Sequence, residues 1–123
     1  MKNKEVFMHV QELGDLYLCD VLVSYIYPRV FICEDSYNCK YIFYEVSSKD
    51  NKDVWLVAKI SKDEYYSLID CQKAIQDVYK NKTDSDLFLI TKIYGENEDS
   101  IELSLDTSEW IKKLPDMPVF AER

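Results

Sequence analysis

Glycine, proline and histidine are scarce in this chain of 123 residues, which holds two glycines, three prolines and one histidine. A phosphate-cradling loop or a dinucleotide-binding fingerprint needs several closely spaced glycines, so both are excluded. The lone His9 has no partner at metal-ligand spacing, and no serine or cysteine lies in a glycine-flanked turn of the kind that presents a nucleophile. We therefore expect no catalytic residues, no cofactor and no metal site, and predict that the protein is not an enzyme.

Long apolar runs are also missing. No segment approaches the ~20 apolar residues of a membrane-spanning helix, and no apolar stretch with a small-residue cleavage site follows the basic N-terminus. The four cysteines (Cys19, Cys33, Cys39 and Cys71) form no CxxC pair and are expected to be reduced thiols. These features favour a cytosolic protein without a membrane partner.

Positive charge is in the minority, with 15 Lys and Arg against 23 Asp and Glu and a net charge of −8. The excess is uneven, since residues 81–123 carry a net −5 and residues 1–80 a net −3. Such a surface repels phosphate backbones and anionic membranes, so direct nucleic-acid binding is disfavoured. It favours a partner protein with a basic surface, although acidity for solubility alone is an alternative explanation.

What the chain does contain is 47% hydrophobic and 14% aromatic residues, enough for one folded domain over 1–123. Its core is expected over about residues 14–110, with 1–12 and 115–123 peripheral. Segments rich in Val, Ile, Leu and Tyr predict one long or two short strands in 16–27, and further strands at 29–34, 40–46, 54–60, 87–94 and 101–105. Polar stretches at 35–38, 47–53 and 95–99 are the expected connections.

The hydrophobic period changes after residue 60. Ser61 and Glu64 form a predicted capping box, and Tyr65, Leu68 and Ile69 fall on one helical face behind it. A second short helix is predicted around 74–79, and one helical turn at 108–114. The expected fold class is therefore α+β: an antiparallel sheet of about five to six strands, a meander then a hairpin, with a short helical hairpin packed on one face.

Three motifs carry a family resemblance. Tyr-Pro-Arg at 27–29 leads into the strand Val-Phe-Ile-Cys at 30–33, and Trp-Leu-Val at 55–57 runs to Ile-Ser at 60–61. After a fitting interval, Leu68 and the segment Ala-Ile-Gln-Asp-Val-Tyr follow. In order and spacing, these motifs resemble an uncharacterised bacterial family, domain of unknown function 6575 (DUF6575). The resemblance covers roughly residues 14–110 and implies a fold but no reaction.

The chain departs from that family pattern at the start of the second helix. Cys71 stands where the pattern has glycine, and Ala74 stands where it has a serine cap. Because a lost cap costs about 1 kcal/mol of local helix stability, the turn between the two helices is expected to differ here.

Arg29 is the first candidate binding residue, because Pro28 restricts the backbone beside it. Its guanidinium could fork onto a carboxylate of a ligand or partner. An internal ion pair that braces the strand, with Glu45 as the cross-strand partner, is the favoured alternative.

Ten tyrosines are more than a core of this size needs, and tyrosine is enriched at interfaces. Because alternate residues of a strand point to opposite faces, the hairpin over 37–44 is expected to leave some tyrosines outward. The predicted partner-binding tyrosines are Tyr37, Tyr41 and Tyr66.

The acidic segment Glu96, Glu98 and Asp99 completes the candidate binding surface. It could imitate a nucleic-acid backbone, or it could be a solvated loop. We predict a small non-catalytic module that inhibits or neutralises a basic partner protein, as an immunity protein, an antitoxin or a phage-encoded inhibitor of a bacterial defence protein does.

Two alternatives remain open from the sequence. One is a small-molecule-sensing or enzymatic domain with a pocket near Arg29. The other is a structural subunit that functions only as an oligomer. The sequence leaves the oligomeric state undetermined.

Overall fold

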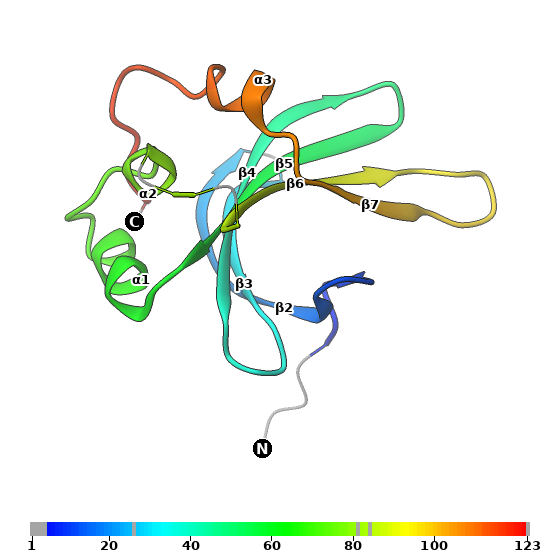
Figure 1. The fold of residues 1–123 in the computed structure, drawn as a ribbon, viewed down its shortest axis with the longest axis horizontal. Helices are drawn as coiled ribbons and strands as arrows, with labels where there is room; N and C mark the ends of the chain where they lie inside the picture. Colours follow the sequence, from blue (N-terminus) through cyan, green and yellow to red (C-terminus); the bar gives the residue numbers. More distant parts are fainter. Residues whose placement is uncertain (1–4, 26, 81, 84, 123) are drawn as a thin grey trace.

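The structure is a computed structural model that describes residues 5–25, 27–80, 82–83 and 85–122. Within these residues, seven antiparallel strands form one sheet in which each strand pairs with its neighbour along the chain. β1 and β7 also contact each other, so the sheet curls into a nearly closed barrel (Figure 1). The strands are β1 (Met8–Val10), β2 (Gly14–Tyr25), β3 (Tyr27–Glu34), β4 (Lys40–Lys49), β5 (Lys52–Ile60), β6 (Leu87–Ile93) and β7 (Ser100–Ser104).

The expected α+β class with five to six strands is wrong, because the fold is mostly β. Its helices are small: α1 (Lys62–Ile69), α2 (Asp77–Lys80) and α3 (Ser108–Ile111). The helix predicted around 74–79 is reduced to the single turn of α2. On the strand side, β1 has three residues, too few to show a period in the sequence.

The polar stretch 47–53 is a tight hairpin rather than the loop that we expected. β4 continues to Lys49 and β5 begins at Lys52, so only Asp50 and Asn51 make the turn. Both have positive φ, 55° and 60°, as a two-residue turn of type I′ requires. Asp and Asn tolerate that region better than other residues with a side chain, which explains why these two occupy the turn.

The face of the sheet inside the curl carries the inner core. Phe31 stacks on Phe43 with ring centroids 5.0 Å apart, and Trp55 approaches both rings edge-on. Pairs of this kind contribute about 0.5–1.5 kcal/mol beyond the apolar area that they bury. The buried members of the inner core are Met8, Val10, Leu16, Phe31, Cys33, Tyr41, Phe43, Trp55, Val57, Phe88 and Ile90.

The opposite face of the sheet carries the helix-side core, which α1, α2 and the C-terminal segment cover (Figure 1). Tyr79 of α2 reaches the sheet, where its hydroxyl lies 3.2 Å from the carbonyl oxygen of Ile42 and 3.0 Å from that of Leu56. The buried members are Leu22, Val30, Ile32, Ile42, Leu56, Ala58, Ile60, Leu68, Ile75, Val78, Tyr79, Leu87 and Leu89.

The predicted capping box at the start of α1 is confirmed. The Ser61 hydroxyl accepts from the Glu64 amide, and the Glu64 carboxylate accepts from the Ser61 amide. At the other end, the amides of Cys71 and Gln72 donate to the carbonyls of Leu68 and Ser67, a Schellman motif. Cys71 has φ +58°, the left-handed conformation that favours glycine, so a residue with a side chain occupies a strained backbone position at this helix end.

Both terminal segments, which we expected to be peripheral, contribute to the packing. Met8 and Val10 are 7% and 1% exposed in the inner core. In the C-terminal segment, Val119 accepts from the Ile75 amide, and the Glu122 amide donates to the Leu22 carbonyl. The C-terminal segment therefore ties the residues just before α2 to β2.

Candidate functional site

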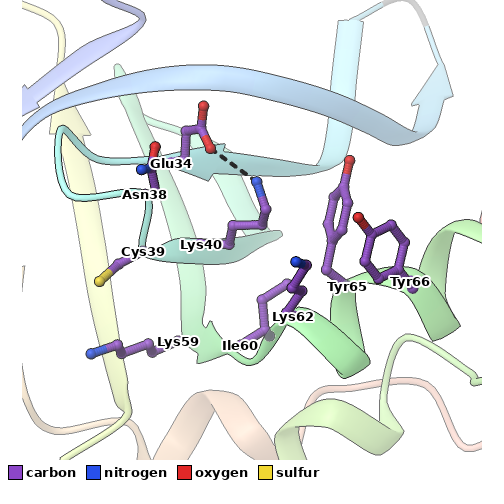
Figure 2. Close-up of a pocket in the computed structure, with 9 residues that line it drawn as sticks. All are labelled: Glu34, Asn38, Cys39, Lys40, Lys59, Ile60, Lys62, Tyr65 and Tyr66. Carbon is purple, nitrogen blue, oxygen red and sulfur yellow. Dashed lines mark hydrogen bonds and ion pairs between the residues drawn. The ribbon is translucent and has the colours of Figure 1, made fainter.

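A pocket of about 550 Å³ lies where the turn between β3 and β4 meets the start of α1. Its walls come from the end of β3, the start of β4, the end of β5 and the first turns of α1 (Figure 2). The pairing of Lys40 with Ile60 brings these elements together. The lining residues are Glu34, Asn38, Cys39, Lys40, Lys59, Ile60, Lys62, Tyr65 and Tyr66.

Lys40 stands in the middle of the pocket and is held from two sides. Its ammonium lies 2.9 Å from Glu34 Oε2 and 4.6 Å from the centroid of the Tyr65 ring (Figure 2). Burial alone would lower the pKa of Lys40, but the hydrogen bond to Glu34 and nearby negative charges outweigh it and raise that pKa. Lys40 is therefore a fixed positive charge rather than a proton donor at neutral pH.

Two tyrosines of α1 form the wall beside Lys40, with ring centroids 5.3 Å apart. The Tyr65 hydroxyl donates to Asp20 Oδ2 at 2.5 Å. This hydrogen bond, then burial, raises the pKa of Tyr65, so its phenol stays neutral. Tyr66 is 52% exposed and presents its ring at the rim.

The turn that forms the opposite wall is organised by Asp35, which is 7% exposed. Its Oδ1 accepts from the amides of Tyr37 and Cys39, both at 2.9 Å, and its Oδ2 accepts from the Tyr41 hydroxyl at 3.3 Å. Asn38, which lies between Tyr37 and Cys39 in the turn, has a positive φ of 67°. The turn is thus fixed by a buried carboxylate, which holds the pocket wall in place.

The charge of the pocket is opposite to that of the whole chain. It contains three lysines and one carboxylate, and neither Lys59 nor Lys62 forms an ion pair within the described part of the chain. In a protein of net charge −8, this excess of two positive charges is a local reversal. With this excess of lysines beside two tyrosine rings, the pocket is suited to hold an anion.

The family follows from a comparison with protein-family models. The one described as "Family of unknown function (DUF6575)" matches residues 4–122. The chain belongs to the DUF6575 family. The resemblance seen in the sequence is therefore confirmed and extends over nearly the whole chain. No curated protein and no solved structure matches this DUF6575 chain.

In this DUF6575 protein, Arg29 forms the internal pair that the sequence favoured. Its guanidinium lies 3.3 Å from Glu45 Oε2, and the Glu45 side chain is 3% exposed. The hollow beside it, about 340 Å³, is lined by these two residues and 46–48, with no described tyrosine among them. This hollow is not the pocket with buried tyrosine hydroxyls that would favour a small-molecule-sensing or enzymatic domain, and that alternative stays a prediction.

The three candidate tyrosines differ in how exposed they are and in where they lie. Tyr37 is 86% exposed at the tip of the β3–β4 turn, and Tyr66 lies on the pocket rim. Tyr41 is 6% exposed in the inner core, so its placement on a binding surface is wrong. The hairpin leaves no outward face for it, because the curled sheet covers one side and the helices cover the other.

Glu96, Glu98 and Asp99 are exposed in the connection between β6 and β7. Lys92 approaches Asp99 at 3.9 Å, and Tyr94 at the base of this connection is 43% exposed. Along β5, residue Lys52 pairs with Ile93 and residue Ile60 with Lys40. The acidic connection and the lysine pocket therefore lie at opposite ends of β5, about 26 Å apart at 3.3 Å per residue.

Sequence reasoning missed the pocket lysines, Lys40, Lys59 and Lys62. One feature of the sequence could have indicated them. The three lysines lie at the start of β4, the end of β5 and the start of α1, which are adjacent when consecutive strands pair as a meander.

Among the described residues, no group of three or more His, Cys, Asp or Glu could hold a metal ion. No helix in the described ranges is long and apolar enough to cross a membrane.

Several phenols make the stability of this DUF6575 protein dependent on pH. Burial raises the pKa of Tyr41 to about 12 and that of Tyr79 well above its usual value, while the hydrogen bond to Asp53, then burial, raises that of Tyr94 to about 12. Tyrosines of the unfolded chain ionise near pH 10, so unfolding releases protons in alkaline solution.

We therefore expect the free energy of unfolding to be level up to about pH 9 and to fall as the pH rises above about 10. Urea midpoints at about pH 8 and about pH 10.5 measure this difference. Equal midpoints would contradict the placement of these hydroxyls.

Proposed function

We propose that the protein is a small, non-catalytic, cytosolic binding module that inhibits or neutralises a partner protein with a basic surface. The observation that supports this most is the shape and charge of the β6–β7 hairpin, which projects from the body of the molecule (Figure 1). Exposed acidic residues lie along its turn, β7 and the residues just after β7, and Lys92 is a basic residue beside them. The acidic residues are Glu96, Glu98, Asp99, Glu102 and Asp106.

Two exposed side chains add contact area beside these acids. Tyr94 is 43% exposed, and its hydroxyl donates to Asp53 Oδ2, which fixes the ring. Leu105, just beyond β7, is 70% exposed. An aromatic and an aliphatic anchor within a charged rim is the usual composition of a protein interface. The proposed binding surface is therefore the β6–β7 hairpin with these two anchors, without Arg29 and Tyr41.

In this proposal, negative charge steers the hairpin onto a basic site of the partner and covers it. Charge steering acts on the association rate and is screened by salt. A toxin that the module neutralises, or a defence effector that it inhibits, would be such a partner. The alternative of an obligate oligomer predicts no monomer in light scattering at dilute concentration.

A charge-neutralised hairpin tests the proposal. Glu96→Gln, Glu98→Gln, Asp99→Asn and Glu102→Gln together are expected to abolish capture of a basic partner from host lysate and to lower its association rate at least ~10-fold. For wild type, that rate is expected to fall about 10-fold between ~50 and ~500 mM salt.

The matched control carries Glu5→Gln, Glu12→Gln, Asp116→Asn and Glu122→Gln, which change the net charge equally at exposed positions elsewhere. It is expected to bind as wild type does. An equal loss in both variants, or an association rate indifferent to salt, would refute the hairpin as the binding surface.

A further inference from the structure

The lysine pocket lies at the far end of β5 from the acidic hairpin, so the proposed protein-binding surface does not account for it. Three lysines line it, although acids outnumber bases in the chain by 23 to 15; the side chains of Lys40 and Lys62 point into the pocket, and that of Lys59 points outward at its edge (Figure 2). A pocket of about 550 Å³ is within the usual range for sites of small molecules. Its composition is thus unexpected for a solvated surface of this protein.

The charge of the pocket indicates the charge of its ligand. Lys40 is already paired with Glu34, which leaves the ammonium groups of Lys59 and Lys62 without an ion pair among the described residues. Two free ammonium groups match a phosphate monoester, which carries between one and two negative charges at neutral pH. Lysine binds phosphate as a point charge and needs no fixed bidentate geometry.

The aromatic wall indicates what the phosphate is attached to. Tyr65 is held by its hydrogen bond to Asp20 and by Lys40 against its ring. Tyr66 stands beside it at the rim, half exposed, with its ring available for stacking (Figure 2). Aromatic side chains stack on flat rings at little entropic cost, since few of their torsions are lost.

The pocket is also preorganised. The Asp35 carboxylate fixes the turn that carries Asn38 and Cys39, and the capping box fixes the start of α1 at Lys62. A site whose walls are already ordered loses little conformational entropy when a ligand binds.

We propose that this pocket binds a small phosphate monoester that carries a flat ring, of the size of a mononucleotide. Lys62, whose side chain points into the pocket, holds the phosphate, Lys59 adds positive charge at the edge, and Tyr66 stacks on the ring. The ligand is a free small molecule rather than a phosphorylated peptide, because the pocket is bounded on both sides by the turn and by α1.

Calorimetric titration at low salt tests the proposed site. AMP is the probe, and adenosine and inorganic phosphate, the two parts of AMP, are titrated separately for comparison. AMP is expected to bind at least ~10-fold more tightly than either part, since both contacts contribute. No binding of AMP at millimolar concentration overturns the proposal, and so does inorganic phosphate that binds as tightly as AMP. A phosphotyrosine peptide that binds more tightly than AMP overturns the assignment to a free small molecule.

Substitutions of the pocket residues test which of them contact the phosphate and which contact the ring. Lys59→Gln with Lys62→Gln is expected to weaken AMP at least ~10-fold, whereas the matched pair Lys49→Gln with Lys52→Gln, exposed at the other end of the sheet, leaves it unchanged. Tyr66→Leu is expected to weaken AMP about 5-fold and to leave inorganic phosphate unchanged. Equal effects of the two lysine pairs would overturn the site.

The charge-neutralised hairpin separates this proposal from the previous one. Because the hairpin is remote from the pocket, that variant is expected to bind AMP as wild type does. A change in AMP affinity in that variant would contradict a separate site.

Discussion

Replacing Tyr79 with alanine is expected to lower the free energy of unfolding by about 3–5 kcal/mol. Tyr79 is 1% exposed, so the substitution opens a cavity of aromatic size in the helix-side core. It also removes the hydroxyl that lies against the carbonyls of Ile42 and Leu56 on two neighbouring strands. A helix of four residues has little stability of its own, so α2 depends on this anchor.

The two contributions of Tyr79 can be separated. Tyr79→Phe keeps the ring and removes the hydroxyl, and is expected to cost about 1–2 kcal/mol. Urea unfolding followed by circular dichroism gives both values, with Tyr37→Ala as the control because Tyr37 is 86% exposed. An alanine variant within about 1 kcal/mol of wild type would show that α2 does not pack on the sheet as described.

Replacing Asp35 with alanine has the second largest expected effect, about 2–4 kcal/mol. The substitution leaves the amides of Tyr37 and Cys39 and the Tyr41 hydroxyl without their acceptor. Because the Tyr41 hydroxyl is buried, its loss of a partner is costly, and the turn loses the group that defines it.

Asp35→Asn is the matched variant, since its amide oxygen can still accept from the two backbone amides. It is expected to cost less than half as much as alanine in the same urea measurement. The AMP affinity gives a second measurement, because the Asp35 turn forms one wall of the proposed pocket. Equal stability of the alanine variant and wild type would refute the role assigned to this carboxylate.

The strands at 29–34, 40–46, 54–60 and 87–94 could be predicted because each is rich in β-branched and aromatic residues, and that at 101–105 because apolar and polar residues alternate in it. The Ser61 capping box was equally visible, since it depends on two residues three apart. The nearly closed sheet was not visible. It depends on a contact between β1 and β7, from opposite ends of the chain, and on a β1 too short to show alternation.

The candidate site was harder to predict from the sequence than the fold, because it depends on how distant parts of the chain come together. Arg29 and Glu45 could be paired from strand neighbourhood alone, and the structure contains that pair. The Lys40–Ile60 pairing that forms the pocket depends on strand register, which the sequence does not specify. Tyr41 was misplaced for a related reason, since alternation tells which residues share a face but not whether that face is covered.

The order of the strands has a consequence for how the chain reaches its native state. Since every strand pairs with its neighbour along the chain, the sheet can grow by adding one hairpin at a time, and most pairings close short loops. Proteins with mainly local contacts fold faster than β proteins whose strands pair across long stretches of chain. Because the approach of β1 to β7 requires the two ends of the chain to meet, we expect this contact to form late in assembly.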